Sequence, residues 1–255
     1  MVIDTHCHLG VDDYDNIQEI IKNFEGNIMI ASGVDTKTNK EVLELISKYD
    51  NIYGTLGIHP EYANEYTNED IEFIENNINN PKVVGVGEIG LDYHYDGINK
   101  EKQKELFIKQ IELAKKYNKT IVVHTRDASL DTFNTIKEMN INVSITIHCF
   151  SESLEMANEY VKLGCKLGIG GVVTFKNGKK LKEVVKNIDI SNIVLETDSP
   201  YLSPEPYRGM KNEPKNVLIV AEEIAKIKDM EVIDVINKTT ENSLKQYKIG
   251  VKDEL

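Results

Sequence analysis

The sequence has few of the features that mark secreted, membrane-embedded or disulfide-stabilised proteins. Its 255 residues include three cysteines, Cys7, Cys149 and Cys165, and none of them form a CxxC pair. An odd number without paired spacing argues against a disulfide framework and against a zinc ribbon. No run approaches the roughly 18 apolar residues of a membrane span, and no basic segment leads into an apolar run at the start. We therefore expect a cytoplasmic protein in a reducing compartment, with no membrane partner.

Positive charge is also scarce. The chain has 42 acidic and 30 basic residues, for a net charge of −12, and Arg126 and Arg208 are its two arginines. A protein that binds duplex nucleic acid over a large part of its surface is usually basic, so the net negative charge of this chain argues against that mode of binding. It does not exclude nucleic acid as a substrate, because divalent metals add local positive charge that this count omits.

The last four residues, 252–255, spell the retention signal KDEL. Such an address acts on a protein that has entered the endoplasmic reticulum. Because we find no signal sequence, we interpret the tetrapeptide as the coincidental end of a tail rich in lysine and glutamate.

Short apolar runs alternate with longer amphipathic stretches along the whole chain. Eight runs are expected to be strands: 2–5, 27–32, 51–57, 82–87, 120–124, 142–148, 165–170 and 192–197. Helical periodicity fills the segments between them, and 232–247 adds one or two helices at the end. No glycine-rich phosphate loop follows the first strand, which disfavours an open dinucleotide-binding sheet. We predict a single α/β domain over 1–255, a TIM-type (β/α)8 barrel with an extra C-terminal helix.

All six histidines fall at or just after the end of an expected strand. These are His6, His8, His59, His94, His124 and His148. In a barrel of this kind, the loops after the strands build the active site. His6 and His8 are two residues apart, so on an extended strand both rings point the same way while Cys7 points away. The clustering favours metal ligation over isolated histidines in the core.

Two acidic residues complete the expected metal site. Glu88 stands among glycines at the end of the fourth run, where its two oxygens are well placed to bridge two cations. Asp198 follows the eighth run and is expected to bind metal and to accept a proton from water. Glu196 and Asp92 are candidates for orienting histidines, and we interpret Cys7 and Cys149 as inert core residues.

Nitrogen and oxygen ligands without thiolate indicate hard or borderline divalent ions such as magnesium, manganese or zinc. Two such ions close together suit displacement at phosphorus. Arg126 and Arg208 both follow barrel strands and are expected to bind phosphate oxygens, whereas Lys176 is interpreted as a surface residue. Tyr93 and the loop around Arg208 are candidates for stacking or phosphate contact.

The chain resembles the TatD family of metal-dependent deoxyribonucleases, within the amidohydrolase superfamily. The resemblance rests on seven motifs in family order: DTHCHL (4–9), GIHP (57–60), GEIGLDYH (87–94), HTRDA (124–128), HCF (148–150), ETDSPYL (196–202) and the RG…NEP stretch (208–214). It implies one metal held by His6, His8, Glu88 and Asp198, and a second held by Glu88, His124 and His148. It further implies that Asp198 is the base and that His59 contacts the substrate phosphate.

The activity implied by the resemblance is hydrolysis of DNA phosphodiester bonds, with 3′–5′ exonuclease action on single strands and dependence on magnesium or manganese. The role of His94 stays open, as does the oligomeric state, a monomer included. A small-molecule amidohydrolase, phosphoesterase or lactonase on the same barrel remains the main alternative. A silent scaffold is disfavoured because all ligand positions are filled, and a purely structural metal is disfavoured because the barrel core already supplies stability.

Overall fold

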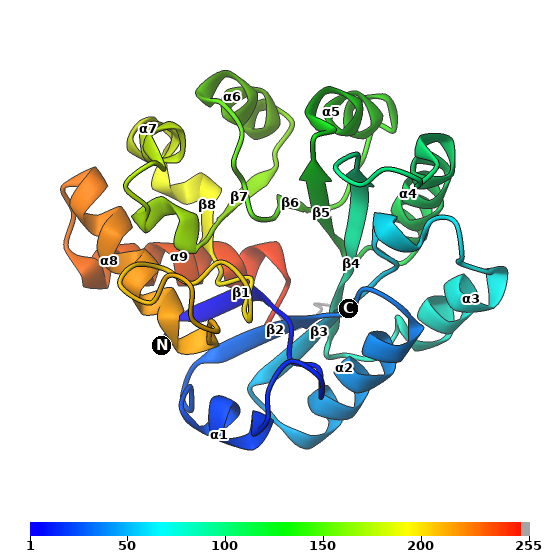
Figure 1. The fold of residues 1–255 in the computed structure, drawn as a ribbon, viewed down its shortest axis with the longest axis horizontal. Coiled ribbons are helices and arrows are strands. Elements are labelled where there is room, and N and C mark those ends of the chain that lie inside the picture. Colours follow the sequence, from blue (N-terminus) through cyan, green and yellow to red (C-terminus); the bar gives the residue numbers. More distant parts are fainter. Residues whose placement is uncertain (251–255) are drawn as a thin grey trace.

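The computed structural model describes residues 1–250, in which strands and helices alternate around a parallel barrel (Figure 1). The strands are β1 (Ile3–Cys7), β2 (Ile28–Ser32), β3 (Ile52–Leu56), β4 (Val83–Asp92), β5 (Thr120–Arg126), β6 (Ile145–Ile147), β7 (Lys166–Ile169) and β8 (Ile193–Leu195). The tetrapeptide 252–255 lies outside the described residues.

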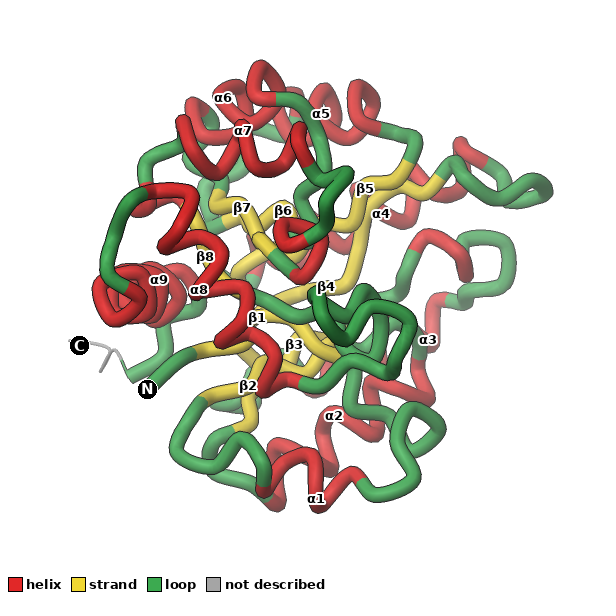
Figure 2. Tube along the Cα trace, turned by 60° about the vertical axis from the view of Figure 1, so that its left-hand side comes forward, coloured by secondary structure: helices red, strands yellow, loops and turns green. Residues whose placement is uncertain are grey.

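One helix follows each strand, and a further helix lies near the end of the described chain. The helices are α1 (Ile17–Lys22), α2 (Thr36–Lys48), α3 (Asn68–Asn77), α4 (Lys100–Lys116), α5 (Ser129–Glu138), α6 (Leu154–Lys162), α7 (Lys179–Asn187), α8 (Val217–Lys228) and α9 (Val232–Gln246). The structure also contains short 3-10 helices: η1 (Pro60–Tyr62), η2 (Gly171–Thr174), η3 (Ile190–Asn192) and η4 (Pro214–Asn216). Figure 2 shows the helices outside the ring of strands.

The barrel closes between its first and last strands. The strands pair in chain order from β1 to β8, all in parallel. The segment after β8 then returns to β1 through a bridge between Cys7 and Ser199, and the His8 backbone N–H donates to the Ser199 carbonyl at 2.7 Å. The predicted TIM-type barrel with an extra C-terminal helix is therefore confirmed, and α9 is that single extra helix.

The strands are apolar because each is covered on both sides, by helices outside and by other strands inside. At the end opposite the strand C-termini, Tyr247 and Ile249 pack against Ile3, Val84 and Val122. Since these partners belong to β1, β4 and β5, the residues that follow α9 fill the interior of the barrel at that end. The C-terminal ends of the strands are thus left to build a site.

The segment before β2 and the fourth strand depart most from the prediction. Of the helical segment expected between the first two strands, only Ile17–Lys22 is an α-helix, because the residues before it form turns and Asn16 caps the helix by accepting the N–H of Glu19. The fourth strand continues five residues beyond its predicted end and reaches Asp92. Glu88 therefore lies within β4 and does not end it, so the placement of Glu88 at the strand end was wrong. The pairing of β4 with β5 shifts register between Val86 and Ile89, and this irregularity accommodates Glu88.

No helix within residues 1–250 combines the length and the apolar character needed to cross a membrane.

Candidate metal centre

Six polar side chains converge at the C-terminal end of the barrel, where five of them line a cavity and the sixth, His6, is fully buried beside it. The cavity has a volume of about 790 Å³, and its lining includes Glu88 from β4 and His124 from β5. His6 lies inside β1, while His8, His148 and Asp198 lie in the loops that follow β1, β6 and β8. The structure therefore brings together all six residues for which the sequence suggested metal ligation.

The two oxygens of the Glu88 carboxylate face different pairs of histidines. Oε2 lies 3.2 Å from His6 Nε2 and 3.5 Å from His8 Nε2. Oε1 lies 2.8 Å from both His124 Nδ1 and His148 Nε2. Glu88 is 4% exposed, so this division is fixed inside the protein rather than sampled at its surface. A carboxylate divided in this way joins two neighbouring clusters of nitrogen ligands.

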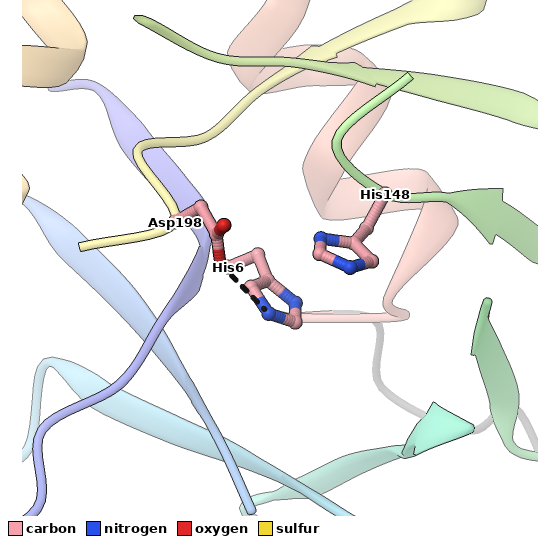
Figure 3. A group of neighbouring side chains, drawn as sticks. All are labelled: His6, His148 and Asp198. Atoms are coloured by element: carbon pink, nitrogen blue, oxygen red, sulfur yellow. Dashed lines mark ion pairs between the residues drawn. The ribbon is translucent and has the colours of Figure 1, made fainter. Parts of the chain in front are cut away.

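Asp198 belongs to the cluster that contains His6 and His8. Its Oδ1 lies 3.4 Å from His8 Nε2 and 3.6 Å from His6 Nε2. Figure 3 shows this carboxylate directed at His6, with the ring of His148 stacked on His6 at 4.0 Å between centroids. The backbone of Asp198 is left-handed, with φ of 54°, a conformation that costs a non-glycine residue about 1 kcal/mol. Its N–H donates to the His6 carbonyl at 2.9 Å, which ties the strained residue to β1.

Two of the candidate ligand histidines, His6 and His8, contact Ser32 at the end of β2 through the ring nitrogen that faces away from Glu88. The Nδ1 of His6 lies 3.1 Å from Ser32 Oγ. The Nδ1 of His8 donates to the Ser32 carbonyl at 3.1 Å, since a carbonyl can only accept. In a neutral His8 ring the proton therefore sits on Nδ1, and the lone pair of Nε2 points at the cluster.

The other two ligand histidines have carboxylates behind them. His124 Nε2 lies 3.0 Å from Asp92 Oδ2, at the end of β4. His148 Nδ1 lies 3.7 Å from Glu196 Oε1, which is longer than a hydrogen bond, and Glu196 Oε1 accepts the Cys149 N–H at 2.5 Å instead. Carboxylates in these positions orient a ligand histidine and raise its basicity. The structure thus places Asp92 and Glu196 where residues that orient histidines are expected.

Gly90 allows β4 to pass His124 at close range. Its φ of 151° is a backbone conformation that residues with a side chain rarely adopt, and a Cβ there would lie 1.9 Å from the His124 carbonyl oxygen. Any larger residue would therefore displace the histidine from Glu88.

The electrostatic balance keeps the carboxylates of the centre ionised. Burial opposes ionisation of Glu88, but the charge of His148 and hydrogen bonds from His124, His148 and His6 outweigh it and hold the pKa of Glu88 well below its usual range. Burial likewise opposes ionisation of Asp198, and the hydrogen bond from His8 with the charges of His148 and His6 lowers its pKa. Two buried anions among imidazoles are the environment that a bound cation stabilises.

The spacing and chemistry of these atoms fit divalent cations. Ligand atoms about 2.1 Å from one ion lie roughly 3 to 3.5 Å from one another, and the contacts described above span 2.8 to 3.6 Å. Among the described residues, the groupings able to hold an ion include His6, His8 and Glu88, and also Glu88, His124 and His148. Behind this set, His148 Nδ1 and Glu196 Oε2 are buried without a hydrogen-bond partner in the protein.

His59 lies beside the centre and has the geometry of a donor. Its Nδ1 accepts the N–H of Glu61 at 3.2 Å, so the proton of a neutral ring is on Nε2. That Nε2 lies 3.5 Å from Glu88 Oε1, and His59 lines the cavity. His59, Asp92 and His124 also form a grouping close enough to surround an ion. In that grouping the Nε2 of a neutral His59 ring carries the proton and the Nε2 of His124 is directed at Asp92.

The remaining basic and aromatic candidates occupy different positions. Arg126 ends β5 and lines the cavity. Arg208 is exposed and outside the cavity lining, with its guanidinium 4.3 Å from the ring centroid of Phe175. Tyr93 is also outside the cavity lining, and its hydroxyl donates a hydrogen bond to the Asp131 carboxylate at 2.9 Å.

His94 and Lys176 also lie away from the centre. His94 is exposed and its Nδ1 lies 2.9 Å from Asp127 Oδ2, so it belongs to the rim rather than to the metal cluster. Lys176 is exposed and does not line the cavity, in keeping with its interpretation as a surface residue.

The interpretation of the cysteines is correct for one residue and wrong for the other. Cys7 is fully buried, packs in the main hydrophobic cluster and directs Sγ at the Ile30 carbonyl. Cys149 is half-buried and lines the cavity, with a left-handed φ of 47°. It is not a core residue, because this turn after β6 directs His148 inward and leaves its neighbour at the cavity wall.

Sequence reasoning missed three residues that shape the site. Asp4 is fully buried in β1 and accepts hydrogen bonds from the Thr197 hydroxyl at 2.6 Å and from the Thr197 N–H at 2.9 Å. Ser32 contacts two ligand histidines, and Tyr95 lines the cavity. An acidic residue inside an apolar strand was a signal for Asp4, whereas neither of the others carried a local signal.

A mixed cluster of histidines and carboxylates at the C-terminal end of a TIM barrel defines a metal-dependent hydrolase. The comparisons with known proteins agree with this class. The family model described as TatD related DNase matches residues 3–248. The chain therefore belongs to the TatD-related family.

Relatives extend over nearly the whole chain. An uncharacterized metal-dependent hydrolase, YabD, from Bacillus subtilis is 42% identical and covers 98% of this chain and 100% of its own length. A second, YcfH from Escherichia coli K12, is 33% identical over 97% of this chain and 96% of its own. The crystal structure of YJJV, a TatD homologue from Escherichia coli, superposes with a TM-score of 0.90 at 26% identity and covers 97% of this chain and 98% of that one.

Proposed function

We propose that this hydrolase cleaves the phosphodiester bonds of DNA with two divalent metal ions, as a 3′–5′ exonuclease on single strands. The observation that carries the proposal is the division of Glu88 between two histidine pairs, at 3.2 to 3.5 Å on one oxygen and 2.8 Å on the other. The two sets of side chains that meet at this carboxylate would hold two divalent ions, the arrangement that supports displacement at phosphorus.

The residues fall into two ligand sets around Glu88. One set consists of His6, His8, Asp198 and Glu88, and the other consists of Glu88, His124 and His148. Histidine and carboxylate ligands without thiolate suit magnesium or manganese for activity, and they also accept zinc. When bound there, the two ions acidify a water molecule and neutralise charge on the phosphoryl group.

The chain's own groups account for the remaining steps. Asp198, ionised and 13% exposed at its side chain, accepts the proton of the attacking water. The Nε2–H of His59 and the guanidinium of Arg126 donate to phosphate oxygens, and Arg126 does so from the cavity rim. The DNA-nuclease name of the matched family supports phosphodiester chemistry over the lactonase or amidohydrolase alternative.

The charge of the cavity favours the end of a single strand over a duplex. Apart from the metal-centre carboxylates Glu88 and Asp198 and the buried Asp92 behind His124, its charged lining consists of Asp13, Glu41, Glu61 and Arg126 within the described part of the chain. Three carboxylates against one guanidinium cannot accommodate the closely spaced phosphates of two strands. Arg208, outside the lining, is available to contact a strand that extends beyond the cavity.

We also propose a cytoplasmic location. The three cysteines are free, and two of them are buried, which suits a reducing compartment.

The proposal is tested with single-stranded DNA labelled at its 5′ end, incubated with purified protein in magnesium or manganese. Stepwise shortening from the 3′ end that EDTA abolishes and added metal restores is the expected result. A metal-loaded protein that leaves DNA intact but opens a lactone or cleaves an amide would overturn the assignment. The same strand annealed to its complement is expected to be cleaved more slowly.

A further inference from the structure

Tyr95 is an exposed aromatic residue on the rim of the cavity, in the loop between β4 and α4. Tyr95 is 47% exposed. It nevertheless lines the cavity that holds the metal centre. The half-exposed ring is therefore open to a ligand that enters the cavity.

Arg126 holds the Tyr95 ring in place. Its guanidinium carbon lies 5.3 Å from the ring centroid, and Nη1 donates to the Tyr95 hydroxyl at 3.4 Å. His94 packs edge-on against the same ring at 5.1 Å between centroids. The ring is thus oriented by two neighbours while remaining open to the cavity, which is the arrangement of a preorganised binding surface.

The charge around the rim indicates where a nucleotide can lie. The acidic lining residues Asp13, Glu41 and Glu61 follow β1, β2 and β3, which are adjacent in the barrel. Tyr95 follows β4, and Arg126 is the last residue of β5. These two strands come next in order around the barrel. An anionic ligand bound at the metal centre is therefore repelled on the side of β1 to β3. On the side of β4 and β5 it meets an aromatic ring and a cation.

We propose that Tyr95, oriented by Arg126, forms a nucleobase subsite in which the base next to the scissile phosphate stacks on the tyrosine ring. The inference rests on the proposed phosphodiesterase function and extends it to recognition of the base. Stacking on an aromatic ring accepts every base, because all bases have a π-face. The subsite therefore selects nucleotides over other phosphodiesters without selecting sequence.

The test compares two esters with the same leaving group. Thymidine 5′-(p-nitrophenyl phosphate) carries a base and methyl p-nitrophenyl phosphate does not, so the ratio of their kcat/KM values reports the base. Tyr95→Ala is expected to lower this ratio by roughly tenfold. Tyr95→Phe is expected to keep it, because the ring remains.

The control is Leu163→Ala. Leu163 is a large apolar residue, 38% exposed, at the end of α6 and outside the cavity lining, so its loss should leave the ratio unchanged. An unchanged ratio in Tyr95→Ala would overturn the subsite, and so would an equal fall in Leu163→Ala. Loss of the preference in Tyr95→Phe would show that the hydroxyl matters rather than the ring, which also contradicts stacking.

A binding measurement separates the subsite from the proposed activity. Titration calorimetry of the metal-loaded protein with thymidine monophosphate and with methyl phosphate needs no turnover. The expected result is a roughly tenfold tighter affinity for the nucleotide that Tyr95→Ala removes. If neither ester is hydrolysed, the proposed function fails while this measurement still decides the subsite: equal affinities in the unmodified protein would refute it.

Discussion

The carboxylate of Asp92 lies 3.0 Å from His124 Nε2, on the side of the ring that faces away from Glu88. This contact fixes the proton of a neutral ring on Nε2 and leaves Nδ1, 2.8 Å from Glu88, free for a cation. Asp92 is 1% exposed although it lines the cavity, so its carboxylate is largely removed from bulk water.

Asp92→Asn is expected to weaken metal binding on the His124 side and to reduce DNA hydrolysis by roughly 10- to 100-fold, because an amide orients the ring less strongly. Metal titration followed by calorimetry measures the first effect and nuclease assays the second. Asp127→Asn is the matched control, since Asp127 pairs with the exposed His94 outside the cavity lining. Equal losses in both variants would contradict the role of Asp92.

Asp198→Asn is expected to lower kcat by roughly 100- to 10,000-fold, because the amide can neither accept the water proton nor match the charge of a carboxylate ligand. Circular dichroism should show an intact barrel, since the side chain contacts only residues of the metal centre among its ion pairs. Near-full activity in this variant would rule out Asp198 as the base.

The salt dependence of substrate affinity should be shallow. Each phosphate neutralised on a single strand contributes about −0.7 to the slope of log affinity against log salt concentration. The cavity lining contains one arginine, so we expect the magnitude of this slope to stay below about 2. Arg126→Gln should remove about 0.7 of it. A slope near −4 would mean that the DNA follows basic residues outside the cavity, contrary to the proposed mode of binding.

Asp4→Ala is expected to destabilise the protein by about 2 to 4 kcal/mol, because it leaves the buried N–H and hydroxyl of Thr197 without an acceptor. Urea unfolding measures the change. Asp15→Ala, at an exposed position before α1, should stay within about 0.5 kcal/mol of the parent. A similar loss in both variants would show that Asp4 is not a structural link between β1 and the end of β8.

The sequence was most informative about elements that bury apolar runs. The run at 120–124 became β5 and the run at 165–170 became β7, with limits shifted by one or two residues, because burial on both faces demands continuous apolar residues. The end of β4 was missed because the polar residue Glu88 interrupts the apolar run there. The strand continues, since the barrel supplies histidine partners for that carboxylate from other strands.

Contacts across the barrel could not be read from the sequence. Ser32 contacts His6 and His8 because β2 lies beside β1, and a serine at the end of an apolar run gives no sign of this. Tyr93 and Tyr95 are equally plausible stacking residues by position. Tyr93 is directed away from the cavity by its contact with Asp131 on α5. Tyr95 is held at the cavity by Arg126 on β5.

The number and position of bound ions test the account most directly. Crystals soaked in manganese and measured at its absorption edge should show two anomalous peaks, one within reach of His6, His8 and Asp198 and the other within reach of His124 and His148, with one oxygen of Glu88 at each. A single peak, or a Glu88 carboxylate that contacts no ion, would contradict the two-metal site.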